Sequence, residues 1–201
     1  MAKIFFATGN KNKLAELKVL VEPLGVEVVS PRDYPEYIAP EETGKTFFEN
    51  AEIKARAACD YTGLPALADD SGLVVPALNG EPGVYSARYS GENATDDENN
   101  VKLLKIMADM EVDDRKACFC AVLCFVTPGG EVCFSEGKVE GHLLKEYRGE
   151  KGFGYDPIFF IDEIGKGMAE IDLAEKNKIS HRSRAFAGIF NALNTHYSKN
   201  A

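Results

Sequence analysis

Residues 117–126 place the strongest limit on how this chain can fold. Every residue of the segment is apolar, at odd and even positions alike, whereas a strand with one face in water alternates apolar with polar side chains. Residues 127–130, Thr-Pro-Gly-Gly, then form a turn signal before a second extended run at residues 132–134. We therefore predict a central β-hairpin that other elements cover on both faces.

The remainder of the chain alternates strand and helix patterns, and two capping boxes of the form Thr-x-x-Glu mark helix starts. The first half of the chain is expected to hold a strand at residues 3–8, a helix carrying Leu14 that stops at Pro23, a strand at 26–29, a loop at 31–40 and a helix that opens at Thr46 and ends before Gly63. A helix from Thr95 to about Met110, the hairpin, extended segments to about Ile161 and a helix from about Ser180 follow. This order predicts an α/β fold with a mixed central sheet flanked by helices. We expect two lobes with the active-site cleft between them, within a single domain of residues 1–201.

Composition narrows the classes of function. With 201 residues, 45% of them hydrophobic, the chain can bury a sizeable core. A net charge of −9 argues against a broad nucleic-acid surface, because such surfaces need many cations. The five cysteines include no C-x-x-C pair, which argues against a disulfide framework and a zinc site. No apolar stretch approaches the roughly 20 residues that cross a bilayer, so we expect a cytoplasmic protein with no nucleic-acid or membrane partner.

Two adjacent carboxylates, Asp69 and Asp70, follow the apolar residues 64–68 and precede Ser71. Carboxylates at the tip of an apolar strand are costly to bury unless they are paired, bind a cation or transfer a proton. Asp, Ser and Gly are also good turn formers, so a solvated strand-to-turn junction is the alternative.

A second acidic pair, Glu41 and Glu42, lies in a string that fits a relaxed phosphate-binding loop pattern, residues 39–46. We reject that interpretation, because Pro40 lacks an N–H group and two glutamates would face phosphate with like charge. The pair suits a hard cation such as Mg²⁺ better. A solvated acidic loop is the alternative.

Two predicted helices begin with cations, against the helix dipole, which favours acids at a helix start. Residues 8–13, Thr-Gly-Asn-Lys-Asn-Lys, link the first strand to the first helix, where backbone amides can bind phosphate. Residues 180–184, Ser-His-Arg-Ser-Arg, follow Lys176 and Lys178 at the start of the last helix. In an acidic protein, two such starts together indicate a site for an anionic or carbonyl-rich ligand rather than two solvated surfaces.

Between these segments, Phe153 is flanked by Gly152 and Gly154, and Asp156 follows. Glycines allow close approach of a flat ligand, an aromatic ring offers a stacking face, and a carboxylate can accept a hydrogen bond from a base N–H. Alone, this pattern is also typical of a simple turn. Beside a basic site and an acidic site it predicts a pocket for a nucleobase.

Together these segments resemble the inosine/xanthosine triphosphate pyrophosphatases. The motifs that carry the resemblance are Phe6-Ala-Thr-Gly-Asn10 with Lys13, Glu41-Glu-Thr-Gly44 with Thr46-Phe47 and Glu49-Asn-Ala51, Ala68-Asp-Asp-Ser-Gly72, Pro82-Gly-Val-Tyr-Ser-Ala-Arg88-Tyr-Ser-Gly91, Gly152-Phe-Gly-Tyr-Asp-Pro157 and Ile179-Ser-His-Arg182. They occur in order over nearly the whole chain, and the combination is highly specific.

The resemblance implies Mg²⁺-dependent hydrolysis of ITP, dITP and XTP to the nucleoside monophosphate and pyrophosphate. It makes Asp70 the proton acceptor and a metal ligand, with Glu41 or Glu42, the latter favoured, as the other metal ligand. The implied substrate-binding residues are Thr8, Gly9, Asn10, Lys11, Asn12, Lys13, Ser71, Phe153, Gly154, Tyr155, Asp156, Lys176, His181 and Arg182. It further implies a homodimer, for which we expect residues 84–89 to contribute to the interface.

Three other functions are alternatives to this one. The chain could act on another altered nucleotide, such as a modified pyrimidine triphosphate. A nucleotide-binding regulatory module would bind without turnover, and an acidic scaffold protein would leave the helix-start cations solvated.

Overall fold

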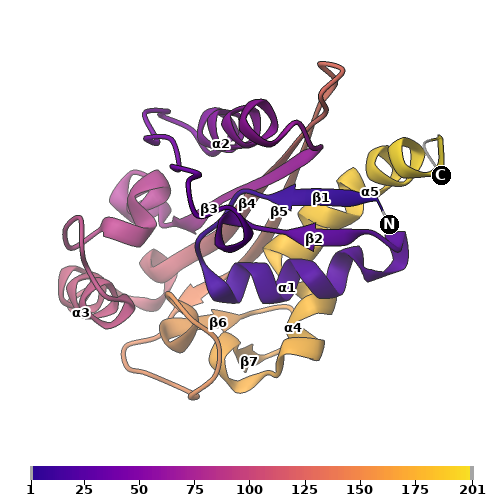
Figure 1. The fold of residues 1–201 in the computed structure, drawn as a ribbon. Coiled ribbons are helices and arrows are strands. Elements are labelled where there is room, and N and C mark those ends of the chain that lie inside the picture. Colours follow the sequence, from indigo (N-terminus) through magenta and orange to yellow (C-terminus); the bar gives the residue numbers. More distant parts are fainter. Residues whose placement is uncertain (1, 200–201) are drawn as a thin grey trace. The chain divides into compact units, whose positions relative to one another are not determined.

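The computed structural model describes residues 2–199, within which the elements alternate as an α/β fold (Figure 1). The strands are β1 (Lys3–Phe6), β2 (Glu27–Val29), β3 (Ala66–Val74), β4 (Lys116–Val126), β5 (Val132–Leu143), β6 (Phe159–Ile161) and β7 (Lys166–Gly167). The α-helices are α1 (Lys11–Val21), α2 (Phe47–Thr62), α3 (Asp96–Ile106), α4 (Leu173–Ile179) and α5 (His181–Lys199). Short 3₁₀ turns occupy several connections, the longest being Gly83–Arg88.

The strands form one mixed sheet in the order β2-β1-β3-β4-β5-β6-β7. Strand β1 pairs in parallel with β2 and β3, and β6 pairs antiparallel with β5 and β7. β4 and β5 are neighbours joined by residues 127–131, so the predicted hairpin and the mixed α/β sheet are confirmed.

Residues of the chain fall into two compact units. Within the described residues, the first unit comprises 2–70, 121–137 and 182–199, and the second comprises 71–120 and 138–181. The single domain predicted for residues 1–201, and the cleft predicted between two lobes, stay predictions.

In the first unit, helices cover both faces of the strands. Helices α1 and α5 pack against Phe6 of β1 and Leu123 of β4, whereas α2 packs against Phe5 and Val122, their neighbours in sequence. Figure 1 shows α2 and α1 on opposite sides of β1. Residues 121–126 of β4 alternate between these two layers, which explains why this part of the strand has no polar face.

The second unit has its own core. Leu103 of helix α3 and its C-cap residue Met107 pack with Val139 of β5 and with Phe159 and Ile161 of β6. No helix in the described residues is both long and apolar enough to cross a membrane. The five cysteines are thiols, and three of them are buried.

Both predicted capping boxes are present. Thr46 and Glu49 bond reciprocally at the start of α2, over 2.9 and 3.2 Å, and Thr95 and Glu98 do so at the start of α3, over 2.8 and 3.2 Å. Helix α3 ends at Ile106, before the predicted end near Met110, because Met107 leaves the helical conformation at its C-cap.

Helix α4 is absent from the prediction. Its N-cap is Asp172, whose carboxylate accepts a 2.8 Å hydrogen bond from the Glu175 backbone N–H. The Asp-x-x-Glu spacing at residues 172–175 was the available signal.

Candidate active site

Asp69 and Asp70 lie inside strand β3, which continues to Val74. The prediction that they end an apolar strand is therefore wrong, and so is the solvated-turn alternative. Only 1% of Asp69 and 6% of Asp70 is exposed. Further along β3, Gly72 passes close to Ser86, and a Cβ atom there would come within 2.3 Å of the hydroxyl oxygen, so the position requires glycine. Consecutive strand residues point to opposite faces, so the two carboxylates have different partners.

Asp69 is the anchor for two cations. Its Oδ1 accepts a 2.5 Å hydrogen bond from the Lys13 ammonium, and its Oδ2 accepts a 2.9 Å bond from Arg182 Nε. Burial opposes the charged form of Asp69, but Arg182 and Lys13 outweigh burial and hold its pKa well below the usual range. Asp69 is therefore a permanent anion that fixes the starts of α1 and α5.

Arg182 lies at the start of α5 and is 1% exposed. Its third contact is a hydrogen bond from Nη1 to the carboxylate of Glu16, a buried acid of α1. Lys13, Asp69, Arg182 and Glu16 thus form a buried chain of alternating charge. The helix-start cations that were predicted to face a ligand are, in Lys13 and Arg182, paired with protein carboxylates.

Asp70 has a different cation, Lys54 of α2. The Lys54 ammonium donates 2.7 Å to Asp70 Oδ1 and lies 2.9 Å from Glu42 Oε1. Burial disfavours the charged form of Lys54, but Asp70 and Glu42 outweigh burial and raise its pKa. Both predicted acidic motifs therefore meet at one lysine.

Sequence reasoning missed Lys54. In the pattern of α2, Ala51, Lys54, Ala55 and Ala58 lie at i, i+3, i+4 and i+7, and all are buried. A lysine on an otherwise apolar helix face is rarely buried without an acidic partner. That irregularity was the signal available for Lys54.

The second oxygen of Asp70, Oδ2, is buried and has no hydrogen-bond partner within residues 2–199. Burial raises the pKa of Asp70, and Lys54 only partly offsets this rise. Glu42 is half-buried beside Lys54, whereas Glu41 is exposed. These contacts favour Glu42 over Glu41 as the acid that works with Asp70.

No three His, Cys, Asp or Glu side chains of the described chain form a ready-made metal cluster. Mg²⁺ is commonly held by one or two carboxylates together with substrate phosphates, so it does not require such a cluster. The open Asp70 Oδ2 and the carboxylate of Glu42 supply two hard oxygen donors at one lysine. The residues present therefore fit the predicted magnesium ion.

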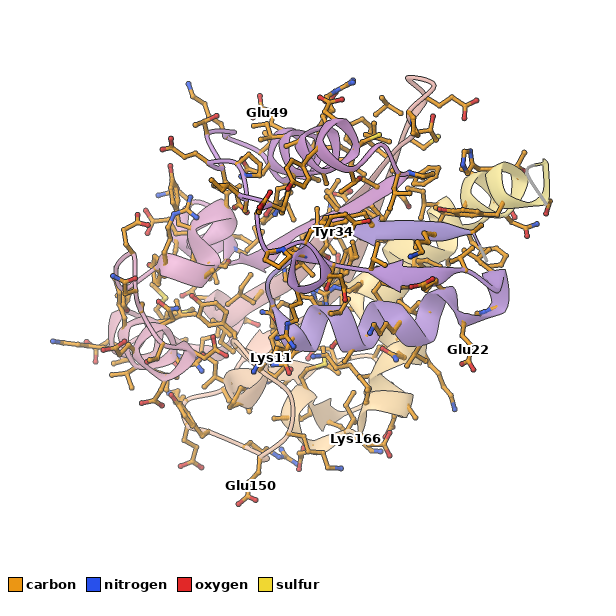
Figure 2. The ribbon with its side chains drawn as sticks, in the orientation of Figure 1. Lys11, Glu22, Tyr34, Glu49, Glu150 and Lys166 are labelled. Carbon is orange, nitrogen blue, oxygen red and sulfur yellow. The ribbon has the colours of Figure 1, made fainter. Side chains whose placement is uncertain are left out.

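Gly9 and Asn10 before α1 and the first two residues of the helix, Lys11 and Asn12, are exposed. Figure 2 shows Lys11 at the start of α1, with Glu22 at the far end. Asn10 caps the helix, because its side-chain oxygen accepts from the backbone N–H groups of Asn12, at 2.9 Å, and Lys13, at 3.2 Å. Two of the amides expected to bind phosphate thus already have a partner.

In the second unit, Asp156 is 2% exposed and receives a 2.6 Å hydrogen bond from Lys176 and a 2.9 Å bond from the Phe153 N–H. Gly152 has φ of 81°, and a Cβ atom there would lie 2.0 Å from Asp156 Oδ2. This glycine therefore makes room for a carboxylate of the protein. The Lys176 ammonium lies 4.4 Å from the centre of the Phe153 ring.

The neighbouring predicted residues are held by protein contacts. The Gly154 N–H donates 2.7 Å to Asp96, and its carbonyl accepts 2.9 Å from Asn100. Buried Tyr155 donates 2.9 Å to the Ser86 carbonyl. His181 stacks on the Phe119 ring with centres 5.0 Å apart, and Ser71 is half-buried in β3.

The predicted residues thus gather within each unit. The first unit brings together Lys13, Glu42, Asp70 and Arg182, and the second brings together Phe153, Asp156 and Lys176. Substrate contacts for all of them, and for Thr8–Asn12, stay predictions.

Comparison with known proteins gives the family. The model of the Ham1 family matches residues 4–192. A dITP/XTP pyrophosphatase of Geobacter sulfurreducens is 50% identical over 93% of this chain and 94% of its own length. One of Thermus thermophilus is 50% identical over 94% of this chain and 91% of its own. The structure of a HAM1 protein from Coxiella burnetii matches with a TM-score of 0.87 and 43% identity, covering 97% of this chain and all of that one. By its residues and by its fold, the chain belongs to the Ham1 family.

Proposed function

We propose that the protein hydrolyses the non-standard purine nucleoside triphosphates ITP, dITP and XTP to the monophosphate and pyrophosphate. The observation that carries this proposal is the buried cluster of Asp70, Lys54 and Glu42, with Asp70 Oδ2 open. Relatives about 50% identical that are named dITP/XTP pyrophosphatases support the substrate class.

Asp70 and Glu42 would hold Mg²⁺. When bound there, the ion supplies positive charge to the phosphate oxygens of the substrate. The charges of the paired side chains support this role. They comprise four carboxylates, Glu16, Glu42, Asp69 and Asp70, and three cations, Lys13, Lys54 and Arg182. A bound divalent ion would therefore change the net charge of this group from negative to positive. A triphosphate then meets a site of opposite sign.

Asp70 would accept the proton as water adds across the α–β phosphoanhydride bond and pyrophosphate leaves. Its pKa is raised by burial, which moves a carboxylate toward the basicity that proton transfer requires. Lys54 holds Oδ1 and so leaves Oδ2 as the oxygen available for this proton. Lys13, beside Asp69, would bind the phosphate oxygens of the pyrophosphate part alike in the substrate and in the product.

Phe153 would stack on the purine. Lys176, which donates to Asp156, contacts the Phe153 ring and would hold that ring in place. The nitrogens of Arg182 contact Asp69 and Glu16, so we assign recognition of the purine O6 to donors next to Arg182 in sequence, such as His181. An adenine amino group would leave such a donor unpaired, which discriminates strongly.

The homodimer and the cytoplasmic location are carried over as proposals from the family resemblance. For the dimer, residues 84–89 offer exposed Tyr85 with Arg88 stacked over its ring at 5.3 Å. An exposed aromatic residue with an arginine is typical of the centre of an interface.

The test of the proposed function is the release of pyrophosphate from a panel of nucleotides. We expect Mg²⁺-dependent release from dITP and XTP, at least about 100-fold faster in kcat/KM than from dATP or dUTP. Guanine also carries O6, so the rate with dGTP measures whether the site rejects the 2-amino group. Equal activity on dATP would contradict 6-keto selection, and preference for dUTP would favour a pyrimidine substrate. Binding of dITP without release of pyrophosphate would favour a regulatory module.

Phe153→Ala should raise KM about tenfold for every purine substrate, with kcat changing less, because stacking on an aromatic ring is worth about 1–3 kcal/mol per base. Steady-state kinetics with dITP and XTP measure the effect. Phe160→Ala is the matched control, since Phe160 is a half-buried aromatic residue of the same unit whose ring centre lies 4.9 Å from that of His142. An unchanged KM for Phe153→Ala would remove Phe153 from the base pocket.

A further inference from the structure

Glu16 is a buried acid to which the proposed reaction gives no task. It is 2% exposed in α1, one helical turn after Lys13 on the same helix face. Its carboxylate accepts a hydrogen bond from Nη1 of Arg182. Burying a carboxylate is costly, so its placement beside the phosphate-binding lysine of the same helix requires a reason.

The contacts of Arg182 with Asp69 are unequal. Arg182 Nε lies 2.9 Å from Asp69 Oδ2, whereas Nη2 lies 3.4 Å from Oδ1. An arginine that faces a single carboxylate usually makes two short parallel bonds. Here the second bond is long, and Oδ1 instead receives the Lys13 ammonium at 2.5 Å.

We propose that Glu16 is a positioning residue of the nucleotide site: by holding Nη1 of Arg182 it keeps the guanidinium from closing on both oxygens of Asp69 and so reserves Asp69 Oδ1 for Lys13. This inference rests on the proposed function, in which Lys13 binds the pyrophosphate part of the substrate. Lys13 and Glu16 belong to one rigid helix, so α1 carries both the lysine and the acid that secures it.

Loss of the Glu16 charge has a defined consequence. Arg182 would then lose its ion pair with Glu16 and keep its ion pair with Asp69, so its Nη2 would compete with Lys13 for Oδ1. A displaced Lys13 weakens contacts to the pyrophosphate part of a ligand and leaves contacts to the nucleoside part intact. We therefore expect a change in KM that is larger than the change in kcat.

The experiment compares Glu16→Gln with wild type. Glutamine keeps the size and an acceptor oxygen but removes the charge. We expect KM for dITP to rise about tenfold with kcat within about threefold, and product inhibition by pyrophosphate to weaken by the same factor. Inhibition by IMP should stay unchanged. Glu22→Gln, an exposed acid just beyond the end of α1, is the matched control and should equal wild type.

A second background tests the route through Lys13. In Lys13→Met, adding Glu16→Gln should not weaken pyrophosphate inhibition further, because the lysine that Glu16 secures is gone. If Glu16→Gln fails to fold, Glu16→Asp, which withdraws the carboxylate by one methylene, should show the same split between KM and kcat.

The outcomes separate the inference from the function on which it rests. A wild-type protein that releases no pyrophosphate from dITP contradicts the proposed function. A wild type that does so, with Glu16→Gln lowering the melting temperature but leaving KM and pyrophosphate inhibition unchanged, makes Glu16 a purely stabilising residue and overturns the inference. Additive losses in the Lys13→Met background overturn it as well.

Discussion

Asp70→Asn should lower kcat for dITP by at least about 1,000-fold, because a positioned general base contributes about 10²–10⁴ and the same residue is proposed to hold the metal ion. Asparagine keeps an oxygen that can accept the hydrogen bond from Lys54, which is 2.7 Å long in the wild type, but it cannot accept the proton. Pyrophosphate release measures the effect, and calorimetry with a non-hydrolysable dITP analogue measures binding.

The control for Asp70→Asn is Asp60→Asn, which changes an exposed acid of α2 in the same unit. It should have wild-type activity. We expect the melting temperature of Asp70→Asn within a few degrees of wild type and binding of the analogue reduced far less than kcat. A near-normal kcat in Asp70→Asn would make the assignment of Asp70 as proton acceptor and metal ligand wrong.

The sequence predicted most of the fold because its strongest patterns are local. The doubly apolar segment 117–126 requires cover on both faces, and residues 121–126 of β4 have it. The capping boxes at Thr46 and Thr95 depend on bonds within one helical turn, so they hold in any context. Helix α4 was missed because it is short, residues 173–179, and has no long apolar face; its Asp172 cap was the one local signal.

The site was harder to predict, because its geometry depends on contacts between residues far apart in the chain. Sequence indicated that Lys13 and Arg182 are unusual for helix starts, but their shared acid, Asp69, is visible only in the fold. Similarly, Asp156 has the chemistry to bind a base, yet Lys176 and the Phe153 N–H already contact its carboxylate. A sequence motif therefore indicates which chemical group a residue offers, whereas only the structure shows which partner that group contacts.

Lys54 joins the two acidic motifs, and Lys54→Met should reduce kcat about 100-fold. Methionine matches the length of the lysine stem without its charge, so Asp70 and Glu42 lose the cation that they share at 2.7 and 2.9 Å. Removing one partner of a buried ion pair leaves an uncompensated charge and costs about 3–5 kcal/mol. Lys54→Arg should recover part of the activity, and Lys45→Met, at an exposed lysine of the same unit, should have none of these effects.

Magnesium gives Lys54→Met a second, independent readout. If the ammonium of Lys54 and Mg²⁺ act on the same two carboxylates, the metal should stabilise Lys54→Met more than wild type, because Asp70 and Glu42 have then lost the cation that they share. Melting temperatures with and without about 5 mM MgCl₂, at constant ionic strength, measure this difference, since binding at roughly ten times Kd adds about RT ln 11 of stability. Calcium and Lys45→Met serve as controls for ion type and for nonspecific charge. An equal magnesium shift in wild type and Lys54→Met would place the metal ion away from Asp70 and Glu42, because only a site elsewhere is indifferent to the loss of Lys54.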